Sequence, residues 1–131
     1  MSYLIDTDWT IDYLNGIGRA VALVTSLVPD PIAISLVTYG EVYDGIYHGT
    51  GQSVSEAGFA RFLDVADILG LDETIMRRFA QIRGDLRGAG RKIGDPDEMI
   101  AATALHHDLT LVTRNLGHFR RVPDLKIYEL G

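Results

Sequence analysis

Residues 95–105 read DPDEMIAATAL, which is the clearest helix start in the sequence. Asp95 suits the N-cap, Pro96 suits the first helical position, and Glu98 completes a capping box. The residues that follow are mostly small, so this predicted helix can pack closely on a sheet. The apolar segment 109–113 then has the length and composition of a buried strand. A helix that leads directly into such a strand is typical of an α/β fold.

The same alternation of short apolar segments and amphipathic helices extends over the rest of the chain. The predicted strands are residues 3–5, 32–34, 66–69, 109–113 and 126–130. The other predicted helices are residues 7–14, 19–27 and 53–64, and two that run from N-caps at Ser35 and Asp72 to about His48 and Gly88. Strands that alternate with helices form a parallel sheet covered on both faces. We therefore expect a three-layer α/β/α fold with a short central parallel sheet.

The composition bounds the class of protein. With 131 residues, 47% of them hydrophobic and 23% charged, the chain has the makeup of a single globular domain, and we expect that domain to span residues 1–131. The absence of cysteine excludes disulfides, thiolate metal sites and a cysteine nucleophile. No apolar stretch has the length of a membrane span, and the first residues lack the pattern of a signal peptide. We therefore expect a cytoplasmic protein.

Charge is distributed unevenly along the chain, whose formal net charge is −6. Residues 1–76 carry eleven acidic and two basic side chains, whereas residues 77–131 carry seven acidic and ten basic ones. Six of the basic residues surround a single acid, Asp85: they are Arg77, Arg78, Arg83, Arg87, Arg91 and Lys92. A basic stripe beside an acidic centre suits a metal-using nuclease, whose cations hold phosphates while its carboxylates hold the metal. A solvated helix face is the other interpretation of this stripe.

Polar side chains fall at positions that a parallel α/β fold brings to one edge of its sheet. Asp6 directly follows the first predicted strand, and Asn115 follows the strand at 109–113. Asp97 lies in the first turn of a predicted helix, and Glu41 lies on a helix face that can point toward the same cleft. Ligand sites of open α/β sheets form outside the carboxyl ends of the strands. Each acid alone could equally be a helix cap or a surface residue.

Three carboxylates that converge on one cleft repel one another unless a cation is bound. Oxygen ligands without cysteine favour Mg²⁺ or Mn²⁺ over zinc. Such an ion can orient a water molecule, lower its pKa and neutralise charge on a phosphodiester. The positions of the acids therefore predict a hard-metal site that could hydrolyse a phosphate ester.

Four segments of the chain resemble the successive motifs of the PIN-domain family. They are LIDTD at residues 4–8, SLVTYGEVYDGI at 35–46, DPDEMIAATAL at 95–105 and LTLVTRNLGHF at 109–119. The resemblance covers nearly the whole chain and is closest to the VapC-like toxins of bacterial and archaeal toxin–antitoxin pairs. It implies a PIN fold, an endoribonuclease activity that depends on Mg²⁺ or Mn²⁺, a homodimer, and inhibition by a cognate antitoxin protein. The RNA that is cut stays open.

The resemblance also implies roles for single residues. Asp6, Glu41 and Asp97 take the positions of the family's metal-binding acids. Asn115 stands where the family often has a fourth acid, and His118 stands where another acid often precedes the phenylalanine. An amide carries less charge than a carboxylate, so we expect one tightly held ion, with Asn115 accepting a hydrogen bond from a water on that ion.

Further residues could support this site. Asp95 could supplement the carboxylates, and the Thr113 hydroxyl could orient an acid or a water. Candidate contacts to the RNA phosphates near the cleft are Arg114, Arg120 and Arg121.

Two alternatives stay open from the sequence. Residues 6–10 fit the D-x-D-x-T motif of haloacid-dehalogenase-like phosphatases, and residues 94–97 resemble that family's late acidic motif. That late motif should follow an apolar strand, which residues 89–93 do not form, and Glu41 has no part in such an enzyme. The second alternative is a non-catalytic module on the same fold that binds RNA or a protein partner, because the fourth acid is missing.

Overall fold

Four parallel strands form the centre of the computed structural model, which describes residues 2–49 and 54–130. The strands are β1 (Tyr3–Ile5), β2 (Ile32–Ser35), β3 (Ala66–Leu69) and β4 (Thr110–Val112). Their order across the sheet is β3-β2-β1-β4, so the direction in which strands are added reverses between β1 and β4. The point of reversal is where open α/β sheets form ligand sites, at the carboxyl ends of the strands.

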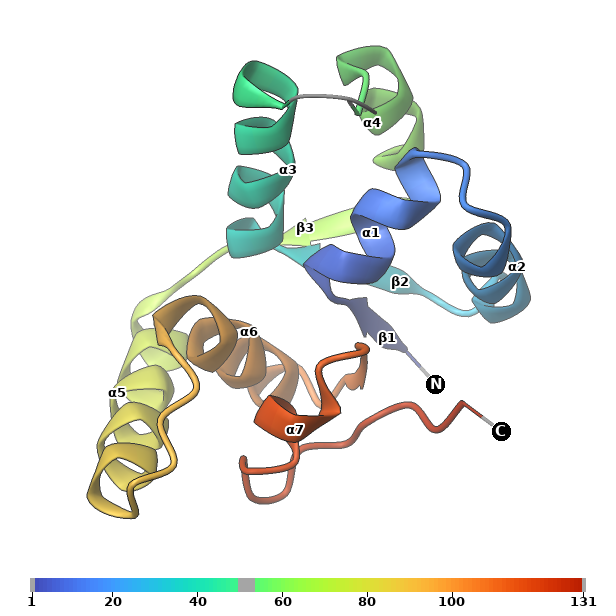
Figure 1. Ribbon diagram of the computed structural model, residues 1–131. Helices are drawn as coiled ribbons and strands as arrows, with labels where there is room; N and C mark the ends of the chain where they lie inside the picture. The colour runs from blue at the N-terminus through green and yellow to red at the C-terminus, as the bar shows by residue number, and fades with distance from the viewer. Residues whose placement is uncertain (1, 50–53, 131) are drawn as a thin grey trace.

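Helices cover both faces of this sheet, as Figure 1 shows. One group packs on the first face: α1 (Thr7–Leu14), α2 (Gly18–Leu27), α3 (Leu36–His48) and α4 (Glu56–Phe62). The other group packs on the second face: α5 (Glu73–Gly88), α6 (Asp95–His106) and α7 (Leu116–Phe119). The predicted three-layer α/β/α architecture with a central parallel sheet is confirmed.

Alternating strand residues separate two hydrophobic cores. On β1, Tyr3 and Ile5 enter the core beneath α1–α4, whereas Leu4 enters the core beneath α5–α7. On β4, Val112 belongs to the first core and Leu111 to the second. This alternation follows from the period of two in a strand, and it buries both faces because the connections of a parallel sheet are helices.

Two helix starts follow the predicted capping chemistry. The Ser35 hydroxyl accepts a hydrogen bond from the backbone N–H of Val37 at 3.1 Å, and the Asp72 carboxylate accepts one from Ile75 at 2.8 Å. Each satisfies a backbone donor that has no partner within its own helix. The helices that follow end at His48 and Gly88, as predicted.

The start of α6 differs from the prediction. Its N-cap is Gly94, whose φ of 102° lies in a region that favours glycine, and Asp95 is already the first helical residue. The Asp95 carboxylate instead accepts a hydrogen bond from Arg83 Nε at 2.9 Å, on α5. Glu98 is fully buried, and neither of its carboxylate oxygens has a partner in the described part of the chain. The predicted capping box is therefore wrong, because Asp95 bonds to Arg83 of α5 and the Glu98 side chain is buried instead of capping the helix.

Two other elements are shorter than predicted. The helix expected over 53–64 begins only at Glu56, after an N-cap at Ser55, and residue 53 lies outside the described residues. Residues 126–130 form a single parallel bridge between Ile127 and Leu111 instead of the predicted strand. No helix within residues 2–49 and 54–130 is both long enough and apolar enough to cross a membrane.

Candidate active site

Asp6 lies at the carboxyl end of β1, where the chain turns into α1. Its backbone N–H donates to the Val112 carbonyl at 2.9 Å, which ties it to β4. One carboxylate oxygen, Oδ1, accepts from the backbone N–H of Thr7 at 2.8 Å and so caps α1. The other, Oδ2, accepts from the Thr113 hydroxyl at 2.6 Å. These hydrogen bonds fix the orientation of Asp6 from β4 and from α1. Only 5% of the residue is exposed.

Among residues 2–49 and 54–130, no cationic side chain pairs with the buried Asp6 carboxylate. The pKa of Asp6 is raised to about 7, with burial as the largest cause and repulsion from Asp8 and Asp97 acting in the same direction. The hydrogen bonds from Thr113 and Thr7 act in the opposite direction but are outweighed. An ionised Asp6 would therefore be stabilised by a positive charge placed between these carboxylates.

Glu41 reaches the same region from α3. Its Oε1 accepts a hydrogen bond from the Thr7 hydroxyl at 2.7 Å, although the two residues are 34 positions apart in the chain. Thr7 Oγ1 also lies 2.9 Å from Thr38 Oγ1, one turn before Glu41 on the same helix. Because Thr7 is the residue capped by Asp6, these contacts place Glu41 beside Asp6, and its exposed side chain forms the outer rim.

Asp97 lies in the first turn of α6 and is held by the segment that follows β4. Asn115 Nδ2 donates to Asp97 Oδ2 at 3.1 Å, and His118 Nδ1 lies 2.9 Å from the same oxygen. The backbone N–H of Asn115 donates to Thr113 Oγ1 at 3.0 Å, and that hydroxyl in turn donates to Asp6. Asp6 and Asp97 are thus joined through Thr113 and Asn115. None of these hydrogen bonds uses Asp97 Oδ1.

The residues present fit a hard divalent cation by their chemistry. The donors are carboxylate and amide oxygens, which Mg²⁺ and Mn²⁺ prefer. Within residues 2–49 and 54–130, no three histidine, aspartate or glutamate side chains are already arranged as a metal cage. The observation that favours a cation is the burial of Asp6 near Asp8 and Asp97, since like charges in a low dielectric are costly unless one is neutralised.

Comparison with known proteins places this site in a family. Residues 3–125 match the PIN domain. The chain belongs to the PIN domain family. It is 33% identical to "Ribonuclease VapC19" of Mycobacterium tuberculosis over 128 residues, which is 94% of this chain and 96% of that protein.

Two solved structures are similar to this PIN domain over nearly their whole length. A chain of VapBC2 from Rickettsia felis, bound to a promoter DNA fragment, has a TM-score of 0.88 at 24% identity and 100% coverage of both chains, which shows the fold alone. A chain of a toxin–antitoxin complex from Klebsiella pneumoniae has a TM-score of 0.74 at 30% identity. The match covers 98% of this chain and 99% of that one. This PIN domain is therefore similar in sequence and in fold to toxin–antitoxin proteins.

The predicted supporting residues of the PIN domain have definite partners. The Asp95 carboxylate is turned toward Arg83 of α5, so it joins two helices beside the site, and that hydrogen bond is the main cause of its lowered pKa. The Arg114 guanidinium pairs with Asp12 and stacks over Trp9, with Cζ 4.0 Å from the ring centroid.

The other two arginines predicted to contact phosphate differ from each other. Arg121 donates from Nη1 to the Arg91 and Lys92 carbonyls at 3.4 and 3.1 Å. Arg120 is exposed. Arg120 is therefore free to approach a phosphate, whereas Arg121 braces the backbone of a neighbouring segment.

Thr7 is a site residue that sequence reasoning missed. Its hydroxyl bridges α1 and α3 by contacting Glu41 and Thr38. The sequence offered one signal for it. Thr7 lies between two aspartates at the first helical position after β1, where its hydroxyl can contact an acid from another element. Asp8, which accepts from the Arg114 backbone N–H at 3.0 Å, raises the negative charge around Asp6 from the same segment.

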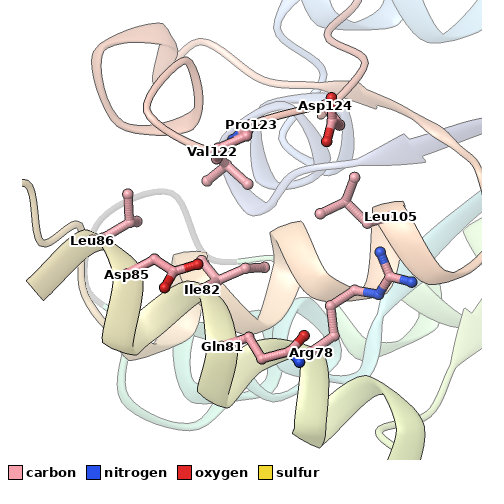
Figure 2. A pocket seen from close by; sticks show the side chains of 9 residues that line it. All are labelled: Arg78, Gln81, Ile82, Asp85, Leu86, Leu105, Val122, Pro123 and Asp124. Atoms are coloured by element: carbon pink, nitrogen blue, oxygen red, sulfur yellow. The ribbon is translucent and has the colours of Figure 1, made fainter. Parts of the chain in front are cut away.

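One hollow with mixed polar and apolar walls lies away from these carboxylates. Figure 2 shows a cavity of about 180 Å³ between α5, Leu105 and the segment Val122–Asp124. Arg78, Gln81 and Asp85 of α5 form its polar side. None of the candidate metal ligands lines it, so this cavity is separate from the candidate site.

Proposed function

We propose that this PIN domain is an endoribonuclease whose Asp6, Glu41 and Asp97 carboxylates hold Mg²⁺ or Mn²⁺. Ribonuclease activity follows from membership of the family that includes the VapC ribonucleases. When bound, the ion supplies activation of a water molecule and neutralisation of charge on the phosphodiester. The observation that carries the metal assignment is the buried Asp6, whose neighbouring charges are other carboxylates.

The side chains around the carboxylates act as positioning groups. Thr113 fixes Asp6 Oδ2, and Asn115 with His118 fixes Asp97 Oδ2, so each acid presents a defined oxygen to the cleft. Such fixed orientation lowers the cost of reorganising the site when charge develops on a phosphate. Glu41 is the exposed member, so the cation can enter and the RNA can approach from its side.

Partners follow from the same family. We propose RNA as the substrate, a second copy of this chain as the partner in a homodimer, and a cognate antitoxin protein as the inhibitor. The antitoxin is supported by the similarity to a chain of a toxin–antitoxin complex. The cytoplasm is the proposed place of action, because the proposed RNA substrate is found there.

The proposal is tested by cleavage of RNA in the presence and absence of a chelator. Purified protein should cleave RNA with added Mg²⁺ or Mn²⁺, lose the activity in EDTA, and regain it when the ion is restored. Hydrolysis of p-nitrophenyl phosphate measured in parallel should stay at background, because the haloacid-dehalogenase-like interpretation needs a strand before residue 94 and that segment has none. EDTA-resistant RNA cleavage would contradict the metal assignment, and RNA binding without cleavage would favour the non-catalytic module.

A further inference from the structure

A group of cations lies beside the carboxylates on the α5–α6 side of the molecule. The C-terminal half of α5 and the segment that joins it to α6 carry Arg83, Arg87, Arg91 and Lys92. At about 100° per residue, Arg83 and Arg87 share one face of α5. Asp85 points to the opposite face, toward the cavity drawn in Figure 2. The acid within this run therefore does not neutralise the face that carries the arginines.

This cationic face is attached to the candidate active site by two contacts. Arg83 bonds to Asp95, two residues before Asp97. Arg121, just after α7, donates to the carbonyls of Arg91 and Lys92. In Figure 1 the α5–α6 connection runs beside α6 and leads into its first turn. The segment that bears the cations is thus braced against the elements that hold Asp97.

Three of the cations have no internal partner in the described part of the chain. Arg87, Arg91 and Lys92 are exposed, and their side chains take part in no hydrogen bond or salt bridge within residues 2–49 and 54–130. Neighbouring unpaired cations raise the local positive potential, which attracts an anionic polymer.

We propose that Arg87, Arg91 and Lys92 form a phosphate-binding strip that holds the RNA strand on one side of the bond to be cut. This inference rests on the proposed nuclease function and adds a requirement on its substrate. The RNA must extend beyond the cleaved bond far enough to reach the strip, so a dinucleotide lacks this contact. The contact is to the backbone, so it positions the strand without reading its bases.

The strip is tested by comparing two triple variants of equal charge. The first combines Arg87→Ala, Arg91→Ala and Lys92→Ala. The control combines Arg19→Ala, Arg61→Ala and Lys126→Ala, which removes three exposed cations from α2, from α4 and from the segment after α7. Binding of a fluorescein-labelled single-stranded RNA is measured by anisotropy in EDTA over a range of salt. A third variant, Arg87→Lys with Arg91→Lys and Lys92→Arg, keeps the charge and tests rescue.

The first variant is expected to bind RNA roughly 100-fold more weakly at 0.1 M salt. Its plot of log K against log salt concentration should have a slope that is flatter by about 2, because each of the three lost phosphate contacts contributes about 0.7. The control and the rescue variant should bind like the unmodified chain. In cleavage assays with Mn²⁺, the first variant should have a higher KM for long RNA than the unmodified chain. Its kcat and its rate of dinucleotide cleavage should be the same as those of the unmodified chain.

Equal weakening in both triple variants, or no weakening in the first, would overturn the strip. The strip would also be overturned if the first variant bound RNA as the unmodified chain does but bound an acidic protein partner more weakly. If the unmodified chain binds RNA through the strip but does not cleave it with Mn²⁺, the strip stands and the nuclease proposal falls.

Discussion

Asp97→Asn is expected to lower kcat/KM for RNA cleavage at least about 1000-fold, which corresponds to about 4 kcal/mol of the activation free energy. The amide has nearly the shape of the carboxylate but lacks its charge, so it cannot offset a divalent cation. The fold should be preserved because Asp97 is only partly buried and its bonded neighbours, Asn115 and His118, come from an ordered segment. Cleavage of a fluorogenic RNA with Mn²⁺ measures the effect.

Asp67→Asn is the matched control for that measurement. Asp67 is an exposed acid on β3, which is the edge strand farthest from β4, and the same change of charge there should leave cleavage unaltered. Full EDTA-sensitive activity in Asp97→Asn would remove this residue from the site. Asp97 is preferred to Asp6 for the experiment because Asp6 also caps α1 and bonds to Thr113, so its replacement mixes structural and chemical effects.

Asp6→Asn is expected to stabilise the metal-free protein at pH 8. The pKa of Asp6 is raised by folding from 3.8 to about 7, so the folded chain holds this proton more tightly than the unfolded chain. The free energy of unfolding therefore falls as the pH rises from about 4 to about 7, by at most about 4 kcal/mol, and stays low above that range. Asparagine stays neutral at all these pH values and keeps an oxygen to accept from Thr7.

Urea unfolding in EDTA at several pH values between 4 and 8 measures this difference. The gap between Asp6→Asn and the unmodified chain should open with rising pH and close again when Mn²⁺ is added to the unmodified chain, since a ligand of the folded state stabilises it. The variant must be compared at each pH, because burial also raises the pKa of Glu98 and contributes in the same direction in both proteins. A variant that is less stable than the unmodified chain at pH 8 would show that Asp6 does not carry a buried, uncompensated charge.

Local sequence signals predicted most of the fold because they agree with the tertiary packing. Ser35 and Asp72 cap the helices that they were expected to cap, and the apolar segment at 66–69 is a strand of the parallel sheet. The signals failed at the start of α6. There, Arg83, twelve residues earlier, binds the Asp95 side chain, and Glu98 is fully buried by tertiary packing. No pattern within the segment itself reports those contacts.

The candidate site was predictable in its residues but not in its connections. Position at strand ends and the resemblance to PIN domains pointed to Asp6, Glu41 and Asp97. The links that hold them are side-chain contacts between distant elements, such as Thr7 with Glu41, and Asn115 with Asp97. Their geometry depends on how α1, α3 and α6 pack around the sheet, which the periodicity of a sequence does not specify. The metal roles of these acids remain predictions.

The most direct test of the account is calorimetric titration of Mn²⁺ into the metal-free chain and into Asp97→Asn, with Asp67→Asn as the control. The account predicts saturable heat for the unmodified chain and for the control, and its loss in Asp97→Asn. Saturable heat of equal size in Asp97→Asn, or none in the unmodified chain, would contradict it.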